Sequence, residues 1–160
     1  MHSRYDGYSF PLRNTVTREK VRFHNRYGIE LAGDLYLPKE VDGKLAAVAV
    51  SGPFGAVKEQ CSGLYAEELA ARGFAALAFD PSFTGESGGA VRNVASPDIN
   101  TEDFSAAVDF LATRDFVDPE KGEPSSLDIY YCDAAGESIT IPGLDVTIPM
   151  DTPYSGLAMA

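Results

Sequence analysis

The chain is poor in cysteine and histidine, the residues that most often build disulfide frameworks, metal sites and nucleophile–base pairs. It has two cysteines, Cys61 and Cys132, which are too few for a disulfide framework, and two histidines, His2 and His24. No Cys-x-x-Cys or His-x-x-x-His spacing occurs. No glycine-rich loop follows a predicted strand and opens a helix, as a phosphate-binding loop does. We therefore predict neither a metal site nor a bound cofactor.

Basic residues are also scarce, since 13 Lys and Arg stand against 24 Asp and Glu and the formal net charge is −11. Nucleic-acid binding depends on many Lys and Arg contacts to phosphates, so we expect no nucleic-acid partner, and an anionic membrane surface is disfavoured for the same reason. No apolar run is long enough to span a bilayer, and the N-terminus lacks the apolar segment of a secretory signal. We expect no membrane partner and a cytoplasmic location.

Lysine and arginine stop altogether after Lys121, and this change in composition divides the chain. We expect residues 1–121 to form one α/β unit and residues 122–160 to form an acidic tail. Within the tail, Leu127–Tyr131 is predicted to be a fifth strand, and the alternation around Pro142 and Gly143 predicts a short hairpin. If the tail leaves the sheet edge open, we expect a homodimer.

The apolar pattern of the first 121 residues predicts an α/β sheet. Lys20–His24 and Glu30–Leu37 alternate around a turn-forming segment, which indicates an antiparallel hairpin. Leu45–Ser51 and Phe74–Phe79 are continuous apolar runs, typical of parallel strands covered on both faces. Helices are predicted over two further segments, residues 63–72 and residues 101–113, with Asn100 or Thr101 as the N-cap of the second.

Five short segments follow one another as in α/β-hydrolases of the dienelactone-hydrolase-like group, which the chain resembles over about residues 5–121. They are Gly28–Pro38, Ser51–Gln60, Ala71–Phe74, Gly85–Gly89 and Val117–Lys121. The resemblance implies a three-layer α/β-hydrolase-like sheet. The sheet is expected to be incomplete, because a whole hydrolase of this kind needs about 250 residues. The reaction it implies is ester or acyl hydrolysis of a small molecule.

In that family the fifth strand runs into a nucleophile elbow, a sharp turn from strand to helix with small residues around Ser or Cys. Cys132 comes nearest to the expected nucleophile position, but Tyr130 stands where a small residue is required. Ser138 lies in a similar pattern, followed by strand-like residues instead of a helix. Ser87 lies in a literal G-x-S-x-G, although neither a strand directly before it nor a helix directly after it is predicted. We expect none of these to be an effective nucleophile.

The family's catalytic residues run in the order nucleophile, acid, histidine. Here no histidine follows His24, so the general base is missing from the expected place. What the resemblance does imply is one oxyanion donor, the backbone N–H of Phe54, with Gly55 as the second option. The alternative is that Pro53, Phe54 and Gly55 form a tight turn with no catalytic role.

Two functions therefore stay open. The first is a catalytically incomplete hydrolase chain that is truncated, decayed, or dependent on a complementing chain. The second is a non-enzymatic binding or interaction module built on the same sheet.

Overall fold

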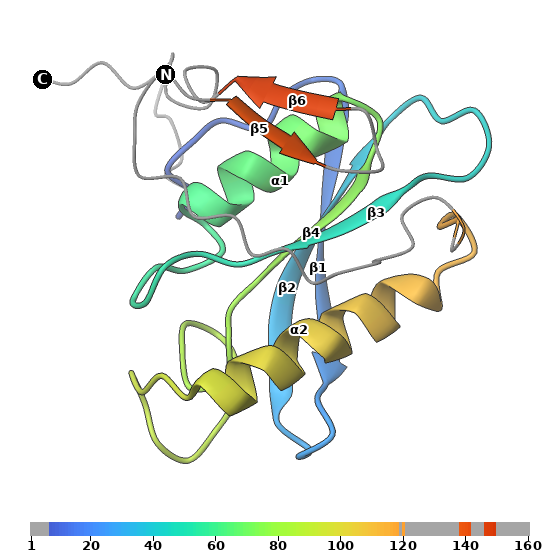
Figure 1. Ribbon diagram of the computed structural model, residues 1–160. Helices are drawn as coiled ribbons and strands as arrows, with labels where there is room; N and C mark the ends of the chain where they lie inside the picture. The colour runs from blue at the N-terminus through green and yellow to red at the C-terminus, as the bar shows by residue number, and fades with distance from the viewer. Residues whose placement is uncertain (1–6, 119, 121–137, 142–145, 150–160) are drawn as a thin grey trace, which may run out of the picture. The chain divides into compact units, whose positions relative to one another are not determined.

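The computed structural model describes residues 7–118, 120, 138–141 and 146–149 (Figure 1). The chain divides into two compact units, Met1–Asp118 and Pro119–Ala160, and each is described by itself. Among the described residues, no helix is long and apolar enough to cross a membrane.

The first unit is built on a four-stranded mixed sheet with the order β1-β2-β4-β3. Its strands are β1 (Val16–His24), β2 (Glu30–Pro38), β3 (Ala47–Val50) and β4 (Ala75–Phe79). β1 and β2 form the predicted antiparallel hairpin, and β3 and β4 pair in parallel, with Ala47 beside Ala75. β2 joins the two halves because it pairs antiparallel with β4. The predicted α/β class, with an N-terminal hairpin and parallel strands, is confirmed.

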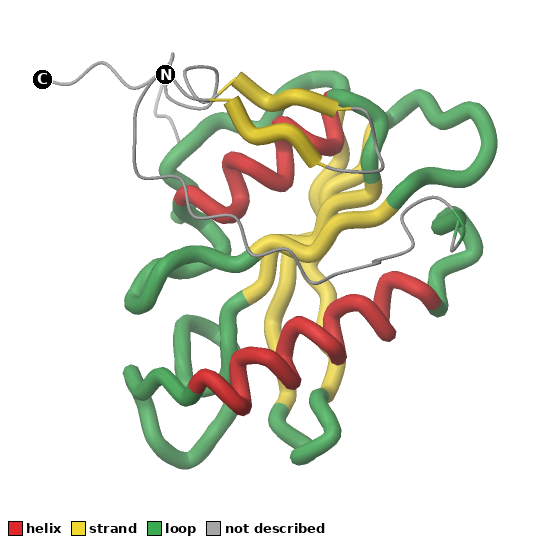
Figure 2. The backbone as a smooth tube through the Cα atoms, viewed as in Figure 1, coloured by secondary structure: helices red, strands yellow, loops and turns green. Residues whose placement is uncertain are grey.

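Two helices lie on opposite sides of this sheet, α1 (Cys61–Ala71) and α2 (Pro97–Ala112) (Figure 2). Gly73 follows α1 with a φ of +95° and its N–H donates to the Ala70 carbonyl, which ends the helix as a glycine at that position commonly does. The predicted start of α2 was wrong, because Ser96 is the N-cap in place of Asn100 or Thr101. Ser96 is extended and Pro97 occupies the first turn, where its fixed φ suits a helix.

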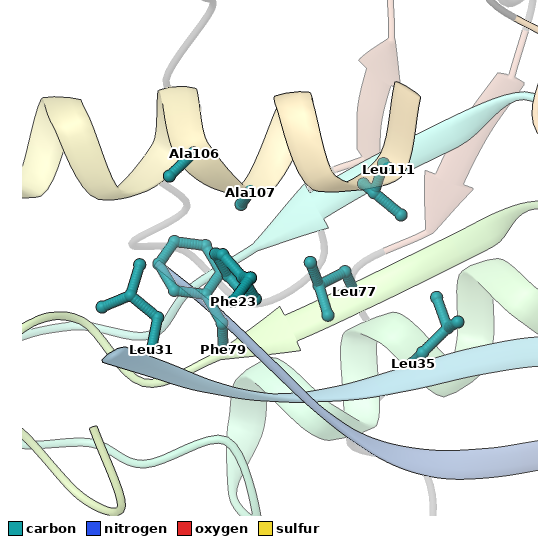
Figure 3. Close-up of a cluster of buried hydrophobic side chains, with 8 residues drawn as sticks. All are labelled: Phe23, Leu31, Leu35, Leu77, Phe79, Ala106, Ala107 and Leu111. Carbon is teal, nitrogen blue, oxygen red and sulfur yellow. The ribbon is translucent and has the colours of Figure 1, made fainter. Parts of the chain in front are cut away.

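The sheet face toward α2 carries an apolar core (Figure 3). It is made of Phe23, Leu31, Leu35, Leu77, Phe79, Ala106, Ala107 and Leu111, all buried. Phe23 stacks on Phe110, and Phe79 meets Phe104 edge to face, both with ring centroids 5.0 Å apart. Side chains alternate between the two faces along a strand. Leu31 and Leu35 of β2 therefore share this face.

The opposite face of β2 is polar, since Asp34 and Tyr36 are both buried on it. The segment before β1 packs here through Tyr8 and Phe10, which are also buried. The Tyr8 hydroxyl donates to Asp34 Oδ2 at 2.8 Å. This segment therefore supplies a hydrogen-bond donor to the buried Asp34 carboxylate.

β3 is half-buried at all four positions and is the last strand in the described order. A parallel bridge between Leu45 and Val117 lies just before it. The Leu45 N–H donates to the Phe116 carbonyl at 2.9 Å, and the Asp118 N–H donates to the Leu45 carbonyl at 2.8 Å. The chain leaving α2 thus begins a parallel ladder beside the segment that leads into β3.

The second unit contains a two-stranded antiparallel sheet of β5 (Ser138–Ile141) and β6 (Val146–Pro149), in which Ile139 pairs with Ile148. The predicted strand Leu127–Tyr131 and the candidate nucleophile Cys132 lie outside the described residues. Nothing in the structure therefore tests the predicted boundary after residue 121 or the fifth strand.

Candidate functional site

A tight turn follows β3, at the end of a parallel strand pair where ligands bind in open α/β sheets. The Ala56 N–H donates to the Pro53 carbonyl at 3.0 Å, and Gly55 has a φ of +87°. A positive φ at the third residue is the signature of a type II turn, and it explains why glycine stands there. Phe54, the second residue of this turn, is 72% exposed.

Two backbone donors of this turn have no hydrogen-bond partner among the described residues. Among the residues that the structure describes, neither the Phe54 nor the Gly55 N–H donates a hydrogen bond, whereas the Ala56 N–H closes the turn. The structure therefore brings together the two residues named from the sequence as alternative oxyanion donors, in an exposed turn. Their role in catalysis is untested and stays a prediction.

A buried charge cluster includes Lys58 of the same loop and was not foreseen from the sequence. Asp80, directly after β4, accepts hydrogen bonds from the Lys58 N–H at 2.8 Å, from Lys58 Nζ at 3.2 Å and from the Glu86 N–H at 2.9 Å. The side chains of Lys58 and Asp80 are fully buried. Glu86 also lies 3.0 Å from Lys58 Nζ and 3.1 Å from Lys20 Nζ.

The cluster favours the charged forms of Lys58 and Glu86. Burial lowers the pKa of Lys58, but the hydrogen bond to Glu59 and the charge of Asp80 outweigh it, so this pKa lies above its ordinary value. The hydrogen bonds from Lys58 and then Lys20 hold the pKa of Glu86 below its ordinary value. Lys58 is therefore a fixed ammonium group and is unsuited to act as a nucleophile or a general base at neutral pH.

Ser87, the serine of the G-x-S-x-G segment, is buried and already fully engaged. Its hydroxyl donates to the Asp80 carbonyl at 2.6 Å and accepts the Ala32 N–H at 2.9 Å. The residues around it form a loop, with no strand directly before it and no helix directly after it. This geometry gives Ser87 a structural role, joining the loop after β4 to β2.

The remaining candidates are not assembled into a triad by the described residues. His24 is exposed at the end of β1, and it lines a shallow cavity of about 390 Å³ that includes neither Phe54 nor Gly55. Ser138 opens strand β5, so no helix follows it as an elbow requires. His2 and Cys132 lie outside the described residues.

A second cavity, of about 320 Å³, lies beside the charge cluster. It is lined by Gly7, Tyr8, Ser9, Lys20, Val57, Glu59, Gln60 and Glu86, and it too excludes the turn. Within the described part of the chain, no three His, Cys, Asp or Glu side chains are grouped as metal ligands would be.

Comparison with known proteins places the fold. No protein-family model matches the chain. The uncharacterized protein PA2218 of Pseudomonas aeruginosa is 65% identical over 114 residues, which cover 71% of this chain and 31% of PA2218. A thiohydrolase of Eupenicillium brefeldianum is 35% identical over 108 residues, covering 68% of this chain and 34% of the relative. The chain therefore spans about a third of the length of the curated relatives it matches.

Solved structures resemble the chain in fold. The crystal structure of PA2218 superposes with a TM-score of 0.70 at 62% identity, covering 75% of this chain and 37% of that one. DcsB in complex with its substrate analogue gives 0.59 at 28% identity, covering 66% and 35%. The α/β-hydrolase GrgF of Penicillium sp. sh18 gives 0.58 at 24% identity, covering 64% and 34%, a likeness that shows the fold alone. The chain has an α/β-hydrolase-like fold, and the finer resemblance to dienelactone hydrolase stays a prediction.

Proposed function

We propose that this chain carries the oxyanion-binding side of an acyl-hydrolase site, acting on the carbonyl group of an ester or a thioester. The observation that carries the proposal is the exposed turn after β3, where the N–H groups of Phe54 and Gly55 are free among the described residues. Such a donor stabilises the negative charge that develops on a carbonyl oxygen during acyl transfer. Thioesters are included because one relative is a thiohydrolase.

We further propose that the 160-residue chain is catalytically incomplete by itself. A serine or cysteine nucleophile needs a base within hydrogen-bond reach and a third group to orient that base. The described residues supply the turn but no such pair, since Ser87 is engaged and His24 lines a cavity that includes neither Phe54 nor Gly55. The nucleophile and the base would then come from a complementing chain or a longer protein.

A chimera tests the proposal directly. The segment of PA2218 that matches this chain is replaced by the corresponding residues of this chain, and hydrolysis of p-nitrophenyl acetate and acetylthiocholine is compared with intact PA2218. We expect PA2218 to hydrolyse at least one of these substrates and the chimera to retain that activity. Absence of turnover in both proteins would argue for the alternative, a non-enzymatic binding module.

Two substitutions at one position then identify the donor. Phe54→Pro removes the N–H yet suits the second position of a type II turn, whereas Phe54→Ala keeps the N–H and removes only the ring. If the Phe54 N–H binds the oxyanion, Phe54→Pro lowers kcat by about 100-fold and Phe54→Ala does not. An active chimera that tolerates Phe54→Pro would assign the role to Gly55.

A further inference from the structure

The carboxylate of Asp80 lies where two loops meet. One is the β3–α1 loop, residues 51–60, which contains the candidate oxyanion turn. The other is the β4–α2 loop, residues 80–96. Asp80 Oδ1 accepts the Lys58 N–H of the first loop, and Asp80 Oδ2 accepts the Glu86 N–H of the second. A single side chain thus holds the backbone of both loops.

The backbone of the β4–α2 loop is wrapped closely around this carboxylate. Gly85 has a φ of +52°, and a Cβ atom added there would lie 2.2 Å from Asp80 Oδ2. Only glycine fits such an approach. This close approach lets the neighbouring Glu86 N–H donate to the carboxylate. The Glu86 side chain lies 3.0 Å from Lys58 Nζ.

The buried ion pair makes this arrangement hard to relax. Asp80 and Lys58 are both fully buried, with Lys58 Nζ 3.2 Å from Asp80 Oδ2. Separating them leaves the buried Asp80 carboxylate without the lysine charge that faces it, which is strongly unfavourable. The two loops are therefore expected to open only together.

We propose that Asp80 is a positioning residue that couples the β3–α1 and β4–α2 loops into one cooperative unit and so sets the candidate oxyanion turn at Phe54 and Gly55. It acts through the Lys58 backbone, four residues beyond Phe54 in the same loop, and does not touch a reacting atom. The coupling follows from contacts in the structure. Its catalytic consequence rests on the proposed function.

Hydrogen exchange on the unmodified chain is the first test, because it needs no hydrolysis and no substitution. Amides that open in one cooperative unit show the same opening free energy and the same response to denaturant. We expect the Lys58 and Glu86 amides to exchange through a shared opening. Separate openings with different denaturant dependence would overturn the coupling, whatever the fate of the proposed reaction.

A matched pair of substitutions is the second test. Asp103 resembles Asp80 because it is buried and accepts three hydrogen bonds, from the Ser82 N–H, Ser82 Oγ and Asn25 Nδ2, but none comes from the β3–α1 loop. Asn in either place exchanges one acceptor oxygen for a donor. We expect Asp80→Asn to speed exchange at the Lys58 amide by about tenfold or more relative to Asp103→Asn, since a charged hydrogen bond is lost.

A spectroscopic reporter follows the turn itself. The chain has no tryptophan, so Phe54→Trp places a single one on the exposed turn. In this background we expect Asp80→Asn to lower the fluorescence anisotropy, and Asp103→Asn to leave it unchanged, at a temperature where circular dichroism shows both variants folded. Equal anisotropy in the two variants, or equal acceleration of the Lys58 amide, would overturn the proposal.

Discussion

Leu45 and Val117 form a parallel bridge although 72 positions separate them in the sequence, and hydrogen bonds to Phe116 and from Asp118 flank it. We expect Asp118→Pro to destabilise the chain by about 1 kcal/mol, because it removes the N–H that donates to the Leu45 carbonyl. Asp118→Ala keeps this N–H and serves as the control. Urea unfolding measures the difference, and equal stability of the two variants would show that the bridge contributes nothing.

Gly63 is packed too tightly for any side chain. A Cβ atom there would lie 2.2 Å from the Lys58 carbonyl oxygen and 3.0 Å from Phe10 Cζ and from the Tyr36 hydroxyl. Helix propensity alone predicts that Gly63→Ala stabilises α1 by about 1 kcal/mol. Because the methyl group has no room, we expect instead a loss of about 1–3 kcal/mol in the free energy of unfolding. A gain in melting temperature would refute the close packing.

Asp34 is expected to make stability fall as the pH rises. Burial raises its pKa above the ordinary 3.8, although the hydrogen bond from Tyr8 and the charge of Lys58 act against this. A raised folded-state pKa gives stability that is fully present below the unfolded-state pKa and is lost as the pH rises through the folded-state value.

The variant Asp34→Asn isolates this effect because it cannot ionise. We expect the stability of the unmodified chain relative to Asp34→Asn to decrease as the pH rises from the ordinary 3.8 through the higher folded-state pKa, measured by urea unfolding. Titrating groups that do not interact with Asp34 are common to both proteins and cancel in the comparison. A difference that is flat with pH, or that grows in favour of the unmodified chain, would contradict the account.

The strands were predictable because their signal is local. The alternation in Lys20–His24 and Glu30–Leu37 and the apolar runs at Leu45–Ser51 and Phe74–Phe79 each identify a strand from neighbouring residues alone. The start of α2 was missed because the apolar helical spacing used to find the helix begins only at Phe104, well after the true start at Pro97.

The charge cluster was not predictable in the same way. Lys58 and Asp80 are 22 positions apart, and a lysine in a loop is usually exposed. The one available signal was that the apolar run Phe74–Phe79 ends directly in a carboxylate, at the end of a parallel strand where functional loops gather. The turn at Phe54 and Gly55 was located because the residues of the loop after β3 carry the family resemblance.

The most direct test of the central claim is turnover of p-nitrophenyl acetate and acetylthiocholine by the purified 160-residue chain alone. The account predicts no saturable turnover above the buffer rate, because an oxyanion donor without a nucleophile and a base does not complete acyl transfer. Saturable turnover that is abolished by Cys132→Ala, Ser138→Ala or Ser87→Ala would contradict the account and identify the nucleophile.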